Sequence, residues 1–504
     1  MADNRLGSLA KQTAIYGLSS IIGRFLNYLL VPLYTYKISA ESGGYGIVTN
    51  LYAYTALLLV ILTFGMETTF FRFSNKEGTN PNKAFSTAAL AVGFVSLMFV
   101  VLVSIFLKPI AGVLDYGAHP EFVEIMAIIV ALDAFQSILF ARLRYENKAL
   151  KFATLKLLFI IVNIGLNLFV FLVAPGLKES HPALMGWYDN SYQVGYIFII
   201  NLICTSLITL GFIPELMKLK YGLDRDLLKE MLSYTWPLLL LGLAGILNQV
   251  ADKICYRFIV PGQEGEVQLG IYGACVKIAM IMAMITQAFR YAYEPFVFGG
   301  KRDTADKETQ ALVMKYFIIF TLLAFLAVVM YMPILRYIIK SDYWEGLRVV
   351  PIVMMAEIFM GIYFNLSFWY KLIDETWWGA VFSTIGCAVL LAVNFIFVPR
   401  VQPGYMACAW GGFAGYATCM VLSYFVGQKK APIPYNLKSA FMYFAIAMVL
   451  FFAQKHIHID NTILTLVVNT VLLIVFMAIV CWFERDLVKG VMGFVNKKLL
   501  KRNS

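Results

Sequence analysis

Long, uninterrupted apolar segments constrain the fold of this chain more than any other feature. A helix needs ~20 apolar residues to cross the hydrocarbon layer of a bilayer, and fourteen such segments follow one another along the sequence. The strands of a membrane barrel would instead alternate over ~10 residues. The sequence therefore predicts an all-α polytopic membrane protein with spans at roughly 12–36, 45–70, 84–107, 121–143, 152–174, 192–213, 232–258, 268–296, 311–332, 348–371, 377–398, 404–427, 437–454 and 462–483.

Composition excludes a soluble globular protein. Charged residues make up 14% of the 504 residues and hydrophobic residues 60%, whereas a soluble domain has about 25% charged residues. The seven cysteines lie inside or at the edges of apolar segments and show no CxxC or other metal-ligand spacing. We therefore expect neither a disulfide framework nor a metal site.

The distribution of Lys and Arg predicts the orientation of the spans. With the N-terminus in the cytoplasm, the cytoplasmic connections carry about three times as many of these residues as the outer connections, as the positive-inside rule requires. Both termini are then cytoplasmic. The same bias accounts for the net charge of +11. We interpret the basic C-terminal tail as a contact with membrane lipids and not with nucleic acid.

An internal repeat is visible in the sequence. An offset of 227 residues pairs Tyr45-Gly46 with Tyr272-Gly273, Glu67 with Glu294, Arg144 with Lys371, and Asn167 with Asn394. Because six spans return the chain to the same side of the membrane, the two repeats are parallel, and a pseudo-twofold axis along the membrane normal relates them.

The repeat predicts the domain organisation. We expect an N-terminal six-helix lobe at residues 1–213 and a C-terminal six-helix lobe at 232–428, with a cleft between them. A polar cytoplasmic linker at 214–231 joins the lobes. Residues 429–504 contain helices 13 and 14 and the basic cytoplasmic tail.

Motifs for nucleotide binding and hydrolysis are absent. The sequence contains no GxxxxGK[ST], GxSxG or HExxH, and the outer loops are short. A transporter of this composition would therefore take its energy from an ion gradient, the membrane potential or substrate supply. We expect no cofactor and no enzymatic activity; a membrane glycosyltransferase or polymerase remains the enzymatic alternative.

Two segments carry a resemblance to a known family. Residues 16–35, YGLSSIIGRFLNYLLVPLYT, and residues 272–298, YGACVKIAMIMAMITQAFRYAYEPFVF, resemble bacterial polysaccharide-biosynthesis flippases of the O-antigen type. These belong to the multidrug/oligosaccharidyl-lipid/polysaccharide exporter superfamily. The resemblance implies alternating-access movement of undecaprenyl-diphosphate-linked oligosaccharide across the bacterial inner membrane. Other polysaccharide-assembly proteins are candidate partners.

Charged residues inside the spans are the candidate substrate contacts, because a charge at mid-helix usually faces a cavity or a partner. Arg24 lies near the middle of the first span, and Asn27 follows on the same helical face. Since a guanidinium offers bidentate donors to phosphate oxygens, we interpret Arg24 as a diphosphate contact. Pairing of Arg24 with Asp133 is the alternative.

The eighth span supplies three further candidates for substrate contact, Gln287, Arg290 and Lys277. Gln287, Arg290 and Glu294 form one polar stripe near its cytoplasmic end, where Arg290 is a candidate contact for an entering phosphate. Lys277 lies ~220° around the helix from Arg290, nearer the outer side, and is a candidate contact for the phosphate at a later stage. The alternatives are an Arg290–Glu294 pair within the helix and a structural role for Lys277.

Candidate ion-coupling residues lie mainly in the second lobe. In the related lipid II flippases a sodium site is built from spans seven, eleven and twelve, and the resemblance matches Asp252 and Asn394 to it. The position four after Asn394 is Val398 and not an acid, and an ion pair of Asp252 with Lys253 or with Arg257 is the alternative. Sodium and protons are the two candidate coupling ions. The full candidate set is Asn248, Asp252, Asn394, Asp133 and Glu357.

A multidrug exporter of the same superfamily, moving organic cations against protons, is the alternative transporter. Such an exporter would be expected to place an acid, and not an arginine, in the cavity of the first lobe. Arg24 therefore argues for an anionic substrate, whereas Asp133 argues for a cationic one.

Charge reversal at Arg24 tests the anion-binding interpretation. We expect Arg24→Glu to abolish glycan export, because a carboxylate repels the diphosphate, while the protein still reaches the membrane. Surface glycan and membrane-inserted protein are measured together in one strain. Export at the wild-type level by this variant would remove the phosphate role of Arg24.

Overall fold

The computed structural model describes residues 28–217, 219, 222–299, 307–457, 459 and 461–485. Within these ranges the chain is helical and contains no strand, as predicted. Thirteen helices in the described part are long and apolar enough to span a membrane, and they match the second to fourteenth predicted spans one to one. The first predicted span lies mostly outside the described residues, as do Arg24 and Asn27; the side chain of Glu294 is also outside the description.

The first lobe follows the chain from α2 to α11. Its elements are α2 (Leu30–Lys37), η1 (Ala40–Ser42), α3 (Gly44–Thr63), α4 (Met66–Ser74), α5 (Pro81–Ile105), α6 (Leu107–Val113), α7 (Pro120–Tyr145), α8 (Ala149–Leu168), the π-helix η2 (Phe169–Val173), α9 (Ala174–Ser180), η3 (Asn190–Tyr192), α10 (Gln193–Gly211) and α11 (Ile213–Leu216). The second predicted span is interrupted between α3 and α4, where Phe64 and Gly65 both take positive φ angles.

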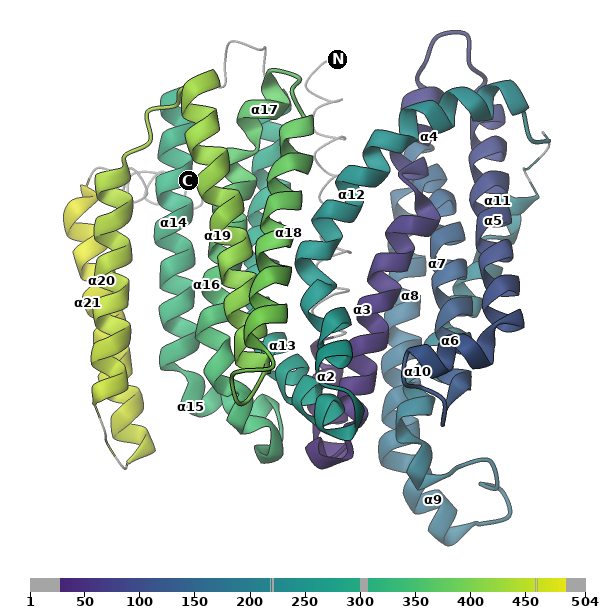
Figure 1. Cartoon of the computed structure of the whole chain (residues 1–504), viewed down its shortest axis with the longest axis horizontal. Coiled ribbons are helices and arrows are strands. Elements are labelled where there is room, and N and C mark those ends of the chain that lie inside the picture. Colours follow the sequence, from purple (N-terminus) through teal and green to yellow (C-terminus); the bar gives the residue numbers. More distant parts are fainter. Residues whose placement is uncertain are drawn as a thin grey trace, which may run out of the picture.

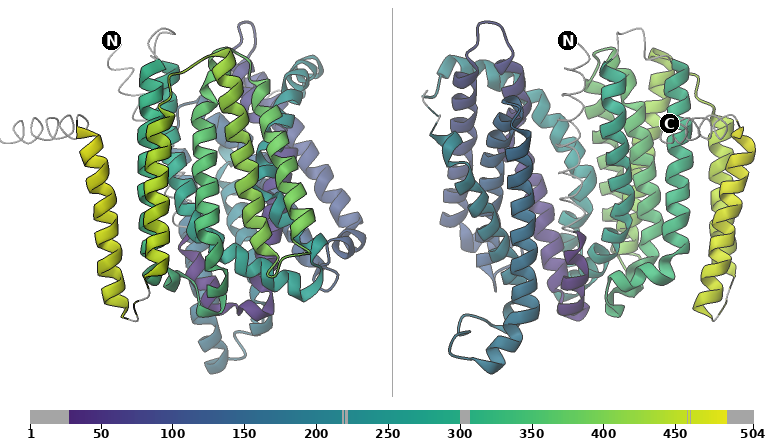
Figure 2. Two further views of the ribbon diagram at one scale, coloured as in Figure 1. Left: turned by 60° about the vertical axis from the view of Figure 1, so that its left-hand side comes forward. Right: turned by 180° about the vertical axis from the view of Figure 1, so that it is seen from behind.

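The second lobe and the terminal pair follow. Their elements are α12 (Arg225–Ile259), α13 (Gly262–Gly299), α14 (Lys307–Met330), α15 (Met332–Leu335), η4 (Arg336–Ile338), η5 (Ser341–Val349), α16 (Val350–Leu366), α17 (Phe368–Leu372), α18 (Trp377–Phe397), α19 (Tyr405–Lys430), α20 (Leu437–His456) and α21 (Thr462–Phe483). Figure 1 shows two helical bundles side by side, and Figure 2 shows α20 and α21 in yellow at the edge of the second.

Helix α12 belongs to both bundles. Figure 1 shows it crossing diagonally from the first lobe, near α4, to the foot of α13. In its first half, the hydroxyl oxygens of Thr235 and Thr69 lie 2.6 Å apart, and the guanidinium of Arg72 lies 4.0 Å from the centroid of the Tyr234 ring. In its second half, the Asn248 amide donates to the backbone oxygen of Ser383 in α18 at 2.6 Å.

Glu484 connects the terminal helix pair, α20 and α21, to the second lobe through polar contacts. Its carboxylate accepts from Lys315 Nζ of α14 at 2.7 Å and from the Tyr443 hydroxyl of α20 at 2.9 Å. The Lys315 and Glu484 side chains are 19% and 10% exposed, so water competes little for this ion pair. Deeper in the bundle, Asn469 Nδ2 donates to the Met330 oxygen at 2.6 Å.

The substitution Lys315→Met tests this attachment. Removing one partner of a poorly hydrated ion pair leaves the other charge uncompensated, so we expect a loss of about 1–3 kcal/mol and a thermal midpoint lower by a few degrees. The matched control is Lys430→Met, which removes the more exposed Lys430–Glu375 pair and should leave the midpoint unchanged. The measurement is the thermal unfolding midpoint of both variants in detergent. Equal midpoints would contradict a stabilising role of the Lys315–Glu484 ion pair.

Candidate functional site

The two lobes meet where glycines of α3 and α13 come together. A Cβ atom on Gly46 would lie 1.9 Å from the backbone oxygen of Glu266, and a Cβ atom on Gly270 would lie 2.9 Å from the backbone nitrogen of Gly46. Backbone atoms cannot move aside for a side chain, so both positions require glycine. We call this contact the seam and define it by Gly43, Gly46, Thr49, Gly270 and Gly273.

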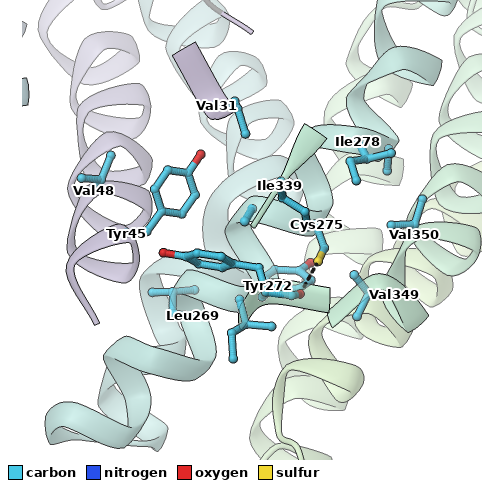
Figure 3. Close-up of a cluster of buried hydrophobic side chains, with 14 of the residues drawn as sticks. Val31, Tyr45, Val48, Leu269, Tyr272, Cys275, Ile278, Ile339, Val349 and Val350 are labelled. Atoms are coloured by element: carbon cyan, nitrogen blue, oxygen red, sulfur yellow. Dashed lines mark hydrogen bonds between the residues drawn. The ribbon is translucent and has the colours of Figure 1, made fainter. Parts of the chain in front are cut away.

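The seam joins equivalent positions of the two repeats. The 227-residue offset pairs Gly43 with Gly270 and Gly46 with Gly273. The Tyr-Gly pair that revealed the repeat therefore also marks where the repeats touch. Figure 3 shows the apolar packing at this contact, with Tyr45 and Val48 contributed by α3 and Leu269, Tyr272, Cys275 and Ile278 by α13.

A buried arginine connects the lobes beside the seam. Arg257 of α12 is 5% exposed, and its Nη2 donates to Asp115 of the first lobe at 2.9 Å and to Glu266 of α13 at 2.8 Å. Its guanidinium lies 4.4 Å from the centroid of the Tyr116 ring. We call Asn50, Asp115, Tyr116, Arg257 and Glu266 the Arg257 cluster. Sequence reasoning missed it, because only the fold brings these positions together.

Asn50 links the Arg257 cluster to Lys253. Its Oδ1 accepts from the Tyr116 hydroxyl at 2.8 Å, and its Nδ2 donates to the backbone oxygen of Lys253 at 2.8 Å. Asn50 lies on α3 and is 1% exposed. The bond between Asn50 and Lys253 therefore crosses from the first lobe to α12 in a buried position.

The Asp252 carboxylate has close polar partners. Lys253 Nζ lies 3.0 Å from both of its oxygens, and the Tyr272 hydroxyl donates to Oδ2 at 2.7 Å. Lys253 Nζ also donates to the Gln249 oxygen at 3.0 Å. The Asp252 side chain is 6% exposed and the Lys253 side chain 18%. The structure therefore contains the predicted alternative in which Asp252 forms an ion pair with Lys253.

Lys277 has no such partner. Gly270, Gly273 and Lys277 follow at intervals of three and four residues, so they lie on one face of α13, the face that meets α3. Lys277 lies about one turn beyond the seam and is half-buried. In the described part of the chain it has no hydrogen bond and no carboxylate within ion-pair distance, and its charged neighbour is another cation, Lys253.

The remaining ion-coupling candidates lie on four helices: Asn248 on α12, Asn394 on α18, Glu357 on α16 and Asp133 on α7. Asn394 is completely buried, and neither atom of its amide has a partner in the described structure. Asn248 donates to Ala244 and Ser383, whereas its Oδ1 has no partner there. Glu357 interacts electrostatically with Lys253. Asp133 interacts in the same way with Lys156, in the interior of the first lobe. Nowhere among the described residues do three or more His, Cys, Asp or Glu side chains gather as a metal site would require.

Arg290 and Gln287 lie far from Lys277. Thirteen residues separate Lys277 from Arg290, a rise of about 20 Å along α13. Arg290 is exposed, and its guanidinium lies 4.4 Å from the Phe364 ring centroid, while Lys371 Nζ lies 4.6 Å from the same centroid. In the first lobe, Arg144, the repeat equivalent of Lys371, forms an ion pair with Glu67 and lies 5.1 Å from the Phe71 ring. We call the end of the molecule that contains Arg144, Arg290 and Lys371 the basic end.

Surface charge at the basic end includes a stabilised carboxylate. Glu375, between α17 and α18, accepts from Lys430 Nζ at 2.5 Å and from Trp378 Nε1 at 2.8 Å. These two donors, the ammonium above all, hold the pKa of the Glu375 carboxyl below its usual value. The Glu375 carboxylate is therefore paired with Lys430 at neutral pH.

Comparison with known proteins identifies the family. A family model described as polysaccharide biosynthesis protein matches residues 9–292, which is more than half of the chain. The chain belongs to this family. A search of curated proteins finds no match.

Solved structures share the fold of this polysaccharide biosynthesis family member. The lipid II flippase MurJ in an inward closed conformation aligns with a TM-score of 0.73 at 16% sequence identity, over 94% of this chain and 99% of that one. An inward-facing multidrug resistance MATE family transporter of the MOP superfamily aligns with a TM-score of 0.61 at 15% identity, over 81% and 94% of the two chains. These likenesses establish a multi-pass membrane fold shared by flippases and transporters.

A cysteine pair tests the seam. A Cβ atom on Gly273 would lie 3.0 Å from the Thr49 Cβ, close to the ~3.5–4.5 Å separation of a disulfide. We expect the double variant Thr49→Cys, Gly273→Cys to form an inter-lobe disulfide under mild oxidation, seen by mass spectrometry of the linked peptides. The single variant Thr49→Cys is the control. Two free thiols after oxidation of the double variant would contradict the α3–α13 contact.

Proposed function

We propose that the protein translocates an oligosaccharide linked through diphosphate to undecaprenyl across the bacterial inner membrane, for assembly of a cell-surface polysaccharide. The observation that carries this proposal is the Lys277 ammonium, which lies half-buried on the inter-lobe face of α13 without an anionic partner in the described structure. An ammonium group in such a place loses hydration, so an anion supplied by the substrate stabilises it.

Lys253 makes the same place attractive to a divalent anion. Two ammonium groups that interact with each other repel, and a diphosphate between them removes that repulsion. Asp252 pairs with Lys253, and Glu357 also interacts with Lys253, whereas Lys277 has no anionic partner in the described structure. The local environment of Lys277 is therefore suited to phosphate oxygens and unsuited to an organic cation.

The basic end is the proposed entrance. We place it in the cytoplasm, because Lys and Arg are concentrated in the connections assigned to that side. Arg290 and Lys371 on the Phe364 ring, with Arg144 in the other lobe, present cations to an approaching diphosphate. Arg24 and Asn27 keep their predicted substrate role, although both lie outside the described residues. The polyprenyl chain stays in the surrounding lipid.

The seam is the proposed closed side, facing outward. Alternating access requires the lobes to separate at the seam and to approach one another at the basic end. The membrane potential favours this direction for an anion, by ~2.3 kcal/mol for each charge moved across 100 mV. Sodium and protons remain the candidate coupling ions; Glu357 and Asp133 are the proposed proton carriers, because neither has a hydrogen-bonded ammonium as Asp252 does. We assign the protein no enzymatic step.

Substitution of Lys277 tests the function. We expect Lys277→Gln to lower surface glycan about tenfold or more and to leave lipid-linked units on the cytoplasmic face, because a charge-assisted hydrogen bond contributes ~1.5–3 kcal/mol. Lys277→Arg, which keeps the charge, should retain most of the export. The measurement compares both variants, at equal protein level, in a strain lacking the chromosomal gene.

Three results would overturn the proposal. Normal export by Lys277→Gln would show that this cation does not contact the substrate. Loss of resistance to cationic dyes in the deletion strain, with normal surface glycan, would instead identify a multidrug exporter. A glycan that reaches the surface only as single repeat units would identify a polymerase.

A further inference from the structure

Lys253 has two separate connections, one through its side chain and one through its backbone. The side-chain ammonium is bound to Asp252 at 3.0 Å. The backbone oxygen accepts the buried hydrogen bond from Asn50 of the first lobe at 2.8 Å. Arg257, one turn later on α12, supplies the ion pair with Asp115 of the first lobe. One short segment of α12 therefore contains both the cation nearest Lys277 and two polar contacts that hold the lobes together.

We propose that Lys253 couples occupation of the anion site to release of the seam. This inference rests on the proposed function, because the anion is the diphosphate headgroup held at Lys277. When the headgroup arrives, the Lys253 ammonium turns from Asp252 to the shared anion. The α12 segment from Asp252 to Arg257 then shifts, and the bonds from Asn50 to Lys253 and from Arg257 to Asp115 break.

Charge explains why the ammonium changes partner. Asp252 offers one negative charge, whereas a diphosphate offers more and also relieves the repulsion between Lys253 and Lys277. The Lys253 side chain is 18% exposed and has a flexible four-carbon stem, so it can reach an anion beside α13. Nothing in this exchange requires Lys277 to move.

Burial explains why α12 must then shift. The Asp252 side chain is 6% exposed, and after the exchange only the Tyr272 hydroxyl among its present donors still stabilises it. A buried carboxylate without a counter-charge is strongly unfavourable. The α12 segment therefore relaxes toward a position in which Asp252 reaches water or takes up a cation.

The contacts that break are suited to opening. Asp115 is 58% exposed, so water competes with its bond to Arg257, and such a pair contributes little net stability. Arg257 keeps Glu266, which lies in its own lobe, as an ion-pair partner. At the seam itself the glycines present no side chain: Gly46 and Gly270 face backbone atoms, and Gly43 and Gly273 face the Glu266 and Thr49 side chains. Of its two ion pairs, Arg257 thus loses only the one with Asp115 of the first lobe.

The experiment uses the full-length protein in nanodiscs with a reporter at the seam. Thr49→Cys places a thiol against Gly273, where it is partly buried while the seam is closed. Nanodiscs contain either undecaprenyl diphosphate or undecaprenol at equal mole fraction. Maleimide modification of the Thr49→Cys peptide is quantified by mass spectrometry, so the native cysteines do not interfere. We expect at least a threefold increase in the rate of modification with the diphosphate lipid.

Three variants on the reporter background separate the steps. Lys253→Met should bind the diphosphate lipid more weakly, through Lys277 alone, and should lose the threefold increase even when compared at an equal amount of bound lipid. Asp115→Asn should raise modification at least threefold with undecaprenol alone, because it removes the negative charge that pairs with Arg257 between the lobes. Lys277→Gln should lose both lipid binding and the increase. Lipid binding is measured separately, from the diphosphate lipid that copurifies when the nanodiscs are dissolved in detergent.

The outcomes distinguish this inference from the proposed function. An undiminished increase in Lys253→Met overturns the coupling role of Lys253 and leaves the transport proposal intact. Unchanged modification in Asp115→Asn overturns the role of the Arg257 cluster in holding the seam. Absence of diphosphate-lipid binding to the reporter protein itself overturns the proposed substrate, and the coupling fails with it.

Discussion

A cation inside a membrane-spanning bundle needs an anion, an aromatic face or water to replace its hydration, and this requirement explains most of the charged contacts here. Lys156 lies 4.1 Å from the Phe140 ring centroid and interacts with Asp133, and Lys253 is bound to Asp252. Lys277 differs, because the charge near it is another ammonium. Lys277 lies beside the glycine seam, and no residue in the described part of the chain supplies it with an anion; this is the place where we propose that the substrate headgroup binds.

Helix α12 determines how the lobes can move. Its first half packs on α4, through Thr235 and Tyr234, and its second half packs on α18, through Asn248. Pro237 lies between these halves and has no backbone N–H for the helical hydrogen bond. Bending at this point allows the second half to follow one lobe while the first half stays with the other. A division into two rigid lobes joined by a linker is therefore too simple.

The sequence predicts the spans well because an apolar run long enough for the bilayer is a local property. It also locates Asp252, Lys253 and Lys277, since charges in apolar runs are visible without a fold. It does not predict the Arg257 cluster, because Asn50, Asp115 and Arg257 are distant in the chain. The sequence suggests Asp252 as a partner for Arg257, whereas the structure pairs Arg257 with Asp115 and Glu266. The break at Phe64 and Gly65 was also missed, because an apolar run shows no interruption where only the backbone turns.

The repeat relates the two lobes, but equivalent residues in them make different side-chain contacts. Asn167 accepts from the Tyr34 hydroxyl at 2.8 Å and donates to the Asn163 oxygen at 2.8 Å, so its amide fixes α2 against α8. The positions equivalent to Tyr34 and Asn163 are Pro261 and Leu390, which offer no side-chain hydrogen bond. Asn394, equally buried, consequently has no partner in the described structure. The first lobe uses its polar interior to hold its helices in place, whereas the second, with Asn394 and the Asp252–Lys253 pair, retains polar groups that can change partners.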